Sequence, residues 1–339
     1  MQEPEVAVLV INYNGKHFLK VCLGSLEKQT YRNYQVYVVD NASTDGSIEY
    51  VKQHFPWVKI IVFSENLGFA KAYNEATSMI NADYAVFLNN DTKVDANWLS
   101  ELVKSALEDE SVVVVGSKIL FYDRPNILQH AGAKITPIGG GVDVGQYEVD
   151  VEKYNKRGFA GAVCGAAMLV RKDEFLKLGG FDDDLFAYFE DIDFCWRVWL
   201  QGFKVTYVPS AVVFHRFGGS WGPRKNPNRL FLGQRNRLMN IIKNLEFKNL
   251  CKAIPISLGY DVLHSLILLV HRNIQGFFAI GRANLWVVLN LRKMMVKRRI
   301  VQSYRKISDR YLKEKSLMAT FKEVIHEYLR LSKLNFNAS

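Results

Sequence analysis

Cysteine is scarce in this sequence, and its few cysteines lie far apart. The 339 residues include four, Cys22, Cys164, Cys195 and Cys251, with neither the close pairs of a zinc site nor the density of a disulfide framework. We therefore expect reduced thiols in a reducing compartment. The segment 1–6 also lacks the basic start and long apolar run of a signal peptide, so we expect a protein that is not exported.

Long uninterrupted apolar runs are missing too. The two most apolar segments of the last third, 254–270 and 276–291, are interrupted by Asp261, His264 and Arg282. Neither reaches the ~18 consecutive apolar residues of a spanning helix, which argues against a transmembrane segment. Because 49% of the residues are hydrophobic, the chain can nevertheless bury a sizeable core.

Acidic residues become rare after residue 223. Residues 1–223 contain 21 Lys and Arg against 28 Asp and Glu, a net charge of −7, whereas 224–339 contain 23 against 6, a net charge of +17. This asymmetry indicates an anionic partner, either nucleic acid or a membrane surface. In 303–334 basic and apolar residues alternate at helical spacing, which favours an amphipathic helix on an anionic membrane. A non-enzymatic protein that binds nucleic acid stays an alternative.

The first third of the chain alternates short apolar strands with helices. The sequence predicts strands at 6–12, 34–40, 58–63, 84–88 and 112–117, and helices at 17–29, 43–53, 69–80 and 98–108. This order predicts an α/β fold with a mainly parallel central sheet flanked by helices. Ligands of such sheets bind at the carboxyl ends of the strands, so the polar residues after Val10, Val39, Val62 and Leu88 are expected to form one site.

The middle of the chain is less regular. Residues 125–154 are rich in glycine and predict a loop or a small hairpin region. Beyond it we expect strands at 162–170 and 203–214, the second with an irregularity at Pro209. Helices are expected at 194–201 and 230–244.

Asn89, Asn90 and Asp91 follow the fourth predicted strand. A carboxylate just past a buried strand needs a partner, and a bound cation is one. Residues at i and i+2 of an extended segment point the same way, so Asn89 and Asp91 can address one ion. The alternative is an ordinary turn, in which Asn and Asp are common.

Other strand ends carry polar residues that suit a nucleotide. Asp40 can accept a hydrogen bond from the imide N–H of uracil or thymine, and Gly68 lets the chain pass close to a ligand or simply makes the turn. Further candidates for contacts with the base, ribose or donor are Asn12, Tyr13, Asn14, Glu65, Asn66, Asn74 and Asn90.

Three carboxylates, Glu190, Asp191 and Asp193, stand among aromatic residues in the segment 186–197. Such surroundings raise the pKa of a carboxyl group and suit it to accept a proton from an alcohol. The alternative is an acidic helix N-terminus, which the helix dipole also favours. His215 follows a later strand and is either a structural histidine or a ligand for a transition metal such as Mn²⁺.

Taken together and in order, these pieces resemble the family 2 glycosyltransferases of the GT-A fold. The resemblance runs over about 5–245, is closest to the rhamnosyltransferase-like branch, and rests on the segments VINYNG, VVDNASTDGS, NLGFAKAYN, FLNNDT, GAAMLVRKDEF, GGFDDDLFAYFEDIDFCWR and HRFGGSW. It implies a GT-A domain at 1–245, with a nucleotide-sugar half at 1–117 and an acceptor half at 118–245. A basic amphipathic helical extension at 246–339 follows.

The resemblance also implies roles for particular residues. Asp191 would be the general base, and Asp40 would bind the nucleotide base. The metal, Mg²⁺ or Mn²⁺, would be held by Asp91 and His215, while Asn89 replaces the first aspartate of the family's metal motif and should weaken metal binding. Arg235 would approach the diphosphate of the donor, and the acceptor cleft would be bordered by Ala166, Ala167 and Met168, with Glu190, Asp193 and Ser220 nearby.

The implied activity is an inverting transfer of a sugar, with rhamnose as a candidate, from a dTDP- or UDP-sugar to a hydroxyl group. The acceptor would be a glycan or a polyprenyl-diphosphate-linked glycan, and the enzyme would lie peripherally on the inner, cytoplasmic face of the cell membrane without binding nucleic acid. A sugar nucleotidyltransferase is a rival class. It would need a glycine-rich, basic phosphate loop after the first strand, where this chain has only the segment 12–16, NYNGK.

Overall fold

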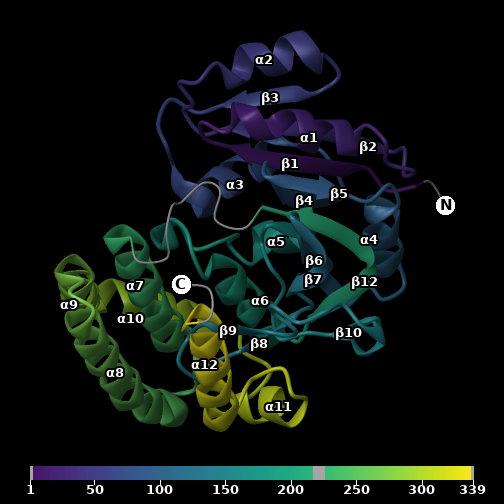
Figure 1. Ribbon diagram of the computed structural model, residues 1–339. Coiled ribbons are helices and arrows are strands. Elements are labelled where there is room, and N and C mark those ends of the chain that lie inside the picture. The colour runs from purple at the N-terminus through teal and green to yellow at the C-terminus, as the bar shows by residue number, and fades with distance from the viewer. Residues whose placement is uncertain (1–2, 217–225, 337–339) are drawn as a thin grey trace.

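The computed structural model describes residues 3–216 and 226–336 and is built around one large mixed sheet (Figure 1). The strands follow the order β10-β12-β6-β11-β4-β1-β2-β3, with β5 paired to β12 and β7 to β6. The parallel half consists of β1 (Val6–Asn12), β2 (Tyr34–Asp40), β3 (Lys59–Val62) and β4 (Tyr84–Asn89). Its helices are α1 (Lys16–Leu26), α2 (Ser47–His54), α3 (Gly68–Met79) and α4 (Trp98–Leu107).

The sheet reverses direction at β11 (Ala167–Arg171). This strand lies antiparallel between β4 and β6 (Val112–Phe121), so the predicted mainly parallel sheet is confirmed with an antiparallel insertion. β12 (Lys204–His215) runs parallel to β6, and the irregularity predicted near Pro209 is a shift in register between Val208 and Val212. The remaining strands are β5 (Thr92–Val94), β7 (Arg124–His130), β8 (Ala133–Ile135), β9 (Gly141–Asp143) and β10 (Gly158–Phe159).

Apolar residues on both faces of β1 explain why its sequence is a continuous apolar run. Val8 and Val10 pack into one buried cluster with α1 and α4, whereas Ala7 and Leu9 belong to a second cluster on the opposite face. A strand covered on both faces has no solvent side and therefore no polar alternation. The core thus forms two layers, one on each side of the sheet.

Several predicted boundaries differ from the observed ones, and three of them are instructive. The helix expected from residue 194 is α6 (Glu190–Leu200) and begins four residues earlier, because its first turn is acidic and invisible to an apolar pattern. The helix expected from residue 43 begins instead at Ser47. The backbone amide of Ser47 donates a hydrogen bond to the side chain of Asp45, just before the helix. The strand expected at 162–170 begins only at Ala167.

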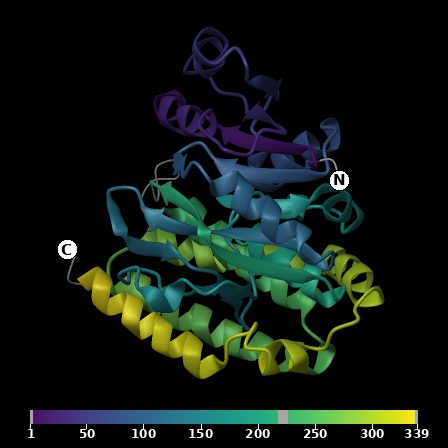
Figure 2. The same ribbon diagram turned by 90° about the vertical axis from the view of Figure 1, so that its right-hand side faces the viewer.

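The helices from α7 onward form a layer at the end of the molecule opposite the N-terminal strands (Figure 2). They are α7 (Pro227–Asn244), α8 (Phe247–Val270), α9 (Ile274–Leu289), α10 (Leu291–Ser303), α11 (Asp309–Glu314) and α12 (Phe321–Phe336). Elsewhere, α5 (Lys172–Lys177) packs against α3 and β11, and short 3₁₀ turns lie at η1 (Glu152–Tyr154) and η2 (Asp183–Leu185). Arg298 donates to the carbonyls of Ile242 and Leu245 at 2.7 and 2.6 Å, satisfying the open C-terminal end of α7. The extension therefore packs tightly on the preceding domain.

Helix α8 corrects the expectation that no segment is long enough to span a membrane. It is continuous over 24 residues and is, among the described residues, the one helix that is long and apolar enough to do so. Asp261 interrupts the apolar sequence but not the helix. Its carboxylate forms an ion pair with Arg237 of α7 at 2.5 Å. Core helices can have the same composition, but only 22% of its most apolar stretch is buried, so α8 lies at the surface.

Candidate active site

A cavity of about 330 Å³ opens where β4 and β12 end and α6 begins. Its position matches the expectation that the site lies at the carboxyl ends of the parallel strands. The lining combines aromatic rings with carboxylate, imidazole and amide groups: Phe69, Asn89, Gln129, His130, Asp143, Cys164, Gly165, Ala166, Tyr188, Phe189, Glu190, Asp191, His215 and Arg229 are among its residues.

Asp191 is the second residue of α6 and faces this cavity. Its Oδ2 accepts a hydrogen bond from the backbone amide of Gly165 at 2.9 Å, and its Oδ1 accepts from the amide of Ile192 at 2.7 Å. Burial raises the pKa of Asp191 above its ordinary value, and the nearby carboxylate of Asp143 raises it further, although the two amides oppose the shift. The result is a fixed carboxylate suited to accept a proton.

The backbone immediately before Asp191 is strained. Phe186, Tyr188 and Phe189 have φ values of 60°, 74° and 65°, in the left-handed region that side chains with a Cβ rarely adopt. Each such residue costs on the order of 1–3 kcal/mol and persists only where its surroundings hold it. Here the side chain of Asn236 in α7 donates to three carbonyls of this loop at 2.7–2.8 Å.

Asp91, His215 and Asn89 meet beside the cavity. His215 Nε2 lies 3.1 Å from Asp91 Oδ1 and 3.5 Å from the Asn89 amide nitrogen. His215 Nδ1 lies 3.1 Å from Gln129 Oε1, which can only accept, so Nδ1 donates to Gln129 and Nε2 is the ring nitrogen that faces Asp91. The buried Oδ1 atoms of Asp91 and Asn89 have no hydrogen-bond partner in the described part of the chain.

Converging lone pairs without donors fit a cation. Within residues 3–216 and 226–336, however, no three His, Cys, Asp or Glu side chains form a cluster that could hold a metal unaided. Asp91 and His215, with Asn89, therefore offer an incomplete ligand set, of the kind that hard divalent ions complete with phosphate oxygens and water.

The ends of β1, β2 and β4 are joined by a network of side chains. Asn12 donates to Asp40 at 3.0 Å and accepts from Asn90 at 2.7 Å. Asp40 is fully buried, and its second oxygen accepts from the amide of Ser43 at 2.9 Å. Asn14 accepts from the backbone of Thr44 at 2.7 Å. The sequence prediction that these strand ends come together is thus confirmed.

Comparison with known proteins agrees with this arrangement. The family model described as glycosyl transferase family 2 matches residues 7–139, and that of glycosyl transferase family group 2 matches residues 84–298. The chain belongs to glycosyltransferase family 2. Members of this family are inverting, so the protein is an inverting glycosyltransferase.

Two curated relatives of this glycosyltransferase are rhamnosyltransferases. The N-acetylglucosaminyl-diphospho-decaprenol L-rhamnosyltransferase of Mycobacterium tuberculosis is 26% identical over 238 residues, which cover 63% of this chain and 77% of the relative. Rhamnosyltransferase WbbL of Escherichia coli is 24% identical over 222 residues, which cover 62% of this chain and 83% of the relative. Both matches agree with the branch that the sequence motifs resemble.

Two solved structures confirm the GT-A fold. GalNAc-T7 with UDP, GalNAc and Mn²⁺ superposes with a TM-score of 0.59 at 18% identity, covering 71% of this chain and 48% of that protein. The mannosyltransferase PcManGT of Pyrobaculum calidifontis, in complex with GDP-Man and Mn²⁺, superposes with a TM-score of 0.54 at 18% identity. The match covers 90% of this chain and 86% of that protein. Both structural neighbours therefore contain Mn²⁺.

Several residues that the sequence singled out in this glycosyltransferase share the cavity. Asn89, Ala166, Glu190, Asp191 and His215 all line it. Ala167 and Met168 are fully buried within β11 and form part of the sheet behind it. Ser220 lies outside the described residues.

Asp193 and Glu190 differ sharply although both belong to the first turn of α6. Asp193 pairs with Arg197 at 2.8 Å and Lys243 at 2.9 Å. Burial opposes its ionisation, but Lys243 and Arg197 outweigh burial and hold the pKa of Asp193 below its ordinary value. Burial and the charge of Asp191 instead raise the pKa of Glu190 well above the usual range, and Glu190 Oε2 has no hydrogen-bond partner among the described residues.

Other predicted donor residues make contacts within the protein. The Asn74 amide donates to Phe181 O at 2.8 Å and to Asp183 at 2.7 Å, so it holds that loop. Arg235 donates to the carbonyls of 184 and 185 and lies 4.9 Å from the Trp286 ring, away from the cavity lining. Their roles in donor binding stay predictions.

The loop between β3 and α3 is also held in place by hydrogen bonds from its own side chains. Asn66 accepts from the Gly68 amide at 2.9 Å and from the Asn41 side chain at 3.0 Å. Gly68 has a φ of +78°, and a Cβ there would lie 2.7 Å from the carbonyl oxygen of Phe186, so glycine is required. Glu65 is exposed, and Tyr13 is half exposed, which leaves both side chains accessible to a ligand.

Four cavity residues escaped the sequence analysis: Gln129, His130, Asp143 and Arg229. His130 Nδ1 lies 2.7 Å from Asp143 Oδ1, and His130 Nε2 accepts from the amide of Cys164 at 3.1 Å. Three of the four come from the glycine-rich segment that predicted only a loop or hairpin. No local sequence signal marks them, because only the packing of β7 and β9 against α6 brings them to the site.

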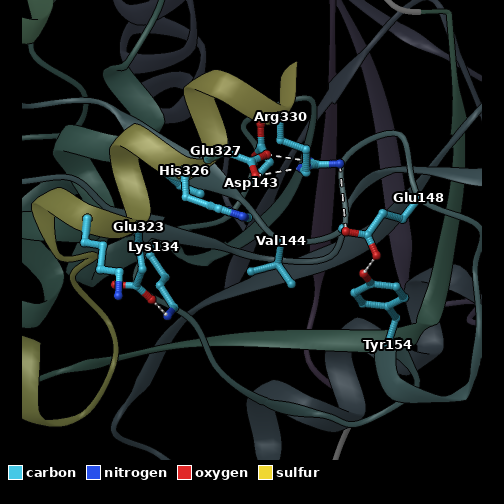
Figure 3. A pocket seen from close by; sticks show the side chains of 12 residues that line it. Lys134, Asp143, Val144, Glu148, Tyr154, Glu323, His326, Glu327 and Arg330 are labelled. Carbon is cyan, nitrogen blue, oxygen red and sulfur yellow. Dashed lines mark hydrogen bonds and ion pairs between the residues drawn. The ribbon is translucent and has the colours of Figure 1, made fainter. Parts of the chain in front are cut away.

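A second cavity of about 430 Å³ lies between β9 and α12, and Asp143 lines both cavities (Figure 3). An ion pair between Lys134 and Glu323, at 2.6 Å, attaches α12 across it. Arg330 of α12 also donates to the carbonyl of Gln146 at 2.8 Å, while its ion pair with Glu327 at 2.5 Å lies within the helix. Arg330 also approaches Glu148 at 3.8 Å, as Figure 3 shows. The C-terminal helix is therefore fastened next to the active-site cavity.

Proposed function

We propose that this glycosyltransferase moves a sugar from a nucleoside-diphosphate donor to a hydroxyl group by a single in-line displacement, with Asp191 as the general base. The observation that carries the proposal is the meeting of Asp191 with Asn89 and His215 in one cavity. A proton acceptor and groups suited to a cation thus line one space that a sugar could occupy. The new bond to the anomeric carbon forms as the bond to the diphosphate breaks, which inverts that carbon.

Asp191 would take the proton from the attacking hydroxyl, a step typically worth ~10²–10⁴-fold in rate. The amides of Gly165 and Ile192 hold its carboxylate in place and leave its remaining lone pairs free. Because burial raises the pKa of Asp191, the carboxylate is a stronger base than an exposed aspartate. Glu190, next to it, is better suited to remain protonated and so would not compete for the role.

Asp91 and His215, with Asn89 beside them, would hold Mg²⁺ or Mn²⁺. The ion would supply positive charge against the negative charge that develops on the leaving diphosphate. Gln129 fixes the tautomer of His215 that presents Nε2 as a ligand. Support comes from the unpartnered oxygens of Asp91 and Asn89, and from the Mn²⁺ bound in two proteins of similar fold.

The donor that we propose is a dTDP- or UDP-sugar, with rhamnose as the sugar. Asp40, at the end of β2, would use its remaining lone pairs to accept from the imide N–H that uracil and thymine share. Rhamnose is favoured by two relatives that carry rhamnosyltransferase names. One of them names a diphospho-decaprenol acceptor, which favours a polyprenyl-diphosphate-linked glycan here.

We propose that the enzyme lies on the inner face of the cell membrane through its C-terminal helices. Val262 and Val270 of α8 are 61% and 81% exposed, and Val288 of α9 is 67% exposed. These apolar side chains belong to a segment, 224–339, with a net charge of +17. Exposed apolar groups edged by Lys and Arg suit the interface of an anionic bilayer.

The test is a donor screen with purified enzyme, Mn²⁺ or Mg²⁺ and a polyprenyl-diphosphate-linked glycan, following nucleotide release and the product. dTDP-rhamnose should give nucleoside diphosphate and a lengthened glycan. Release of inorganic diphosphate would instead indicate nucleotidyl transfer and would contradict the proposal. Sedimentation with anionic vesicles tests the membrane part, and no binding at low salt would contradict it.

A further inference from the structure

The basic residues of α10 reach the loop that carries the proposed base. Lys293 pairs with Asp184 at 2.6 Å, and Lys297 pairs with both Asp182 and Asp184. Asp182 is almost fully buried and also pairs with Lys243 of α7 at 2.6 Å. Part of the positive charge that the sequence assigned to a membrane is therefore directed inward, at the segment 182–189.

Helix α7 continues this contact along the same loop. Asn236 binds three of the loop's carbonyls, and Asn240 donates to the carbonyl of Phe189 at 3.2 Å. Lys243 and Asn244, one helical turn further on, bind Asp193 just past the proposed base. Successive turns of one helix thus hold the whole path from the start of the loop into α6.

The loop also touches the donor half of the enzyme. The carbonyl of Phe186 accepts from the amides of Phe69 and Ala70, at 2.6 and 3.2 Å, where α3 begins. Gly68 has no room for a side chain because Phe186 packs against it. The 182–189 loop is therefore a junction of three parts: the donor half, the N-terminus of α6 and the C-terminal extension.

We propose that Lys293 and Lys297 are positioning residues for transfer, acting through Asp182 and Asp184 to hold the 182–189 loop and with it Asp191. The extension would then serve the chemistry itself in addition to membrane attachment. The inference rests on the proposed role of Asp191 as base. Three residues with positive φ make the loop dependent on its surroundings. Removing Lys297 also leaves two enclosed carboxylates facing each other without their shared cation.

Lys297→Met is the decisive variant, and Arg299→Met is its matched control. Arg299 lies on the same helix and is exposed, and among the described residues it has no ion pair, so its loss removes the same charge from the membrane-facing segment. Both variants are assayed as full-length enzyme, with and without anionic vesicles. Steady-state rates, donor affinity, and hydrogen exchange of the 182–189 amides are measured.

For Lys297→Met we expect kcat to fall by about 10- to 100-fold, as misplacement of a catalytic group does, with donor affinity nearly unchanged. Exchange of the 182–189 amides should become faster. Lys297→Arg, which keeps the charge, should recover most of the rate. Arg299→Met should leave kcat and loop exchange as in the wild type. Equal losses in both Met variants would overturn the proposal, because the effect would then be one of overall charge.

Lys293→Met covers the case in which Lys297→Met does not fold. Lys293 is half exposed and, within the described part of the chain, has an ion pair only with Asp184, so this variant should fold and show a smaller change of the same kind. If the 182–189 amides exchange at the wild-type rate in both lysine variants, the proposal is overturned. This result does not depend on which sugar the enzyme transfers. Full activity in Asp191→Asn would instead contradict the proposed base, so the two failures are distinguishable.

Discussion

His215 Nε2 and Asp91 Oδ1 lie 3.1 Å apart, although the two residues are far apart in the sequence. The antiparallel pairing of β5 with β12 sets His215 opposite Thr92, next to Asp91. The strand register therefore decides the distance between them, and the turn between β4 and β5 supplies the carboxylate. A short ladder between two strands thus assembles the proposed ligands of the cation.

Asp91→Ala should abolish most metal-dependent donor binding. We expect at least a ~10-fold rise in the dissociation constant of the nucleotide-sugar in the presence of Mn²⁺ and little change in EDTA, since only the metal-linked part is lost. Calorimetric titration with and without Mn²⁺ measures both. Gln129→Met should lose less of the Mn²⁺-dependent affinity than Asp91→Ala does. Gln129→Glu, which keeps an acceptor for His215, should lose the least. Unaltered Mn²⁺-dependent affinity in Asp91→Ala would contradict the assignment.

Asp191→Asn should remove transfer while leaving donor binding nearly intact. Loss of a general base is expected to lower kcat by ~10²–10⁴-fold. Single-turnover transfer and donor titration on the same preparation separate the two effects. Asp173→Asn, an exposed neighbour of Lys172, serves as a control for the change from Asp to Asn. Turnover close to that of the wild type in Asp191→Asn would rule out this residue as the base.

Asp143→Asn should move the acidic limb of the pH–rate profile to lower pH. Burial first, and then the negative charge of Asp143, raise the pKa of Asp191, and a base works only above its pKa. Activity is therefore lost as pH falls through the raised pKa of Asp191. Removing the charge of Asp143 lowers this pKa. The profile of kcat/KM against pH measures the shift. An unmoved limb, or one displaced to higher pH, would contradict the inference that the charge of Asp143 raises the pKa of the base.

Glu190→Gln should stabilise the protein at neutral pH. Burial and the charge of Asp191 raise the pKa of Glu190 in the folded state. A carboxyl group of this kind leaves stability intact below its unfolded pKa, and stability falls as pH rises from the unfolded pKa toward the higher folded pKa. The variant should therefore match the wild type near pH 4, around the ordinary value for Glu, and exceed its Tm increasingly toward pH 8. Thermal unfolding across this range measures the difference, and a constant offset would contradict the explanation.

The sequence by itself determined the parallel half of the sheet and the order of its strands. β1, β2 and β4 are largely apolar and end in polar residues, and their apolar character reflects a sheet that is covered on both faces. The local sequence pattern therefore reveals both the strand and the polar residues at its end. Asn89 and His215 were found in this way, whereas Asp191 stood out as a carboxylate among aromatic residues, and the structure places all three at one cavity.

Only the tertiary structure decided which other residues join them. Gln129 and Asp143 stand in a glycine-rich segment with no periodic pattern, and they reach the cavity because short antiparallel strands fold back beside α6. Arg235 is a different case: the family resemblance implies a diphosphate contact, and in the structure its guanidinium donates to the backbone carbonyls of residues 184 and 185.

The C-terminal third shows the same division. Its composition established a basic, apolar, helical segment, because charge and hydropathy are sums over residues that need no neighbours. Which cations face outward and which pair with Asp182 and Asp184 depends on the packing of α10 against α7. Pairing between residues far apart in the chain is a property of the fold, and no local pattern in the sequence contains it.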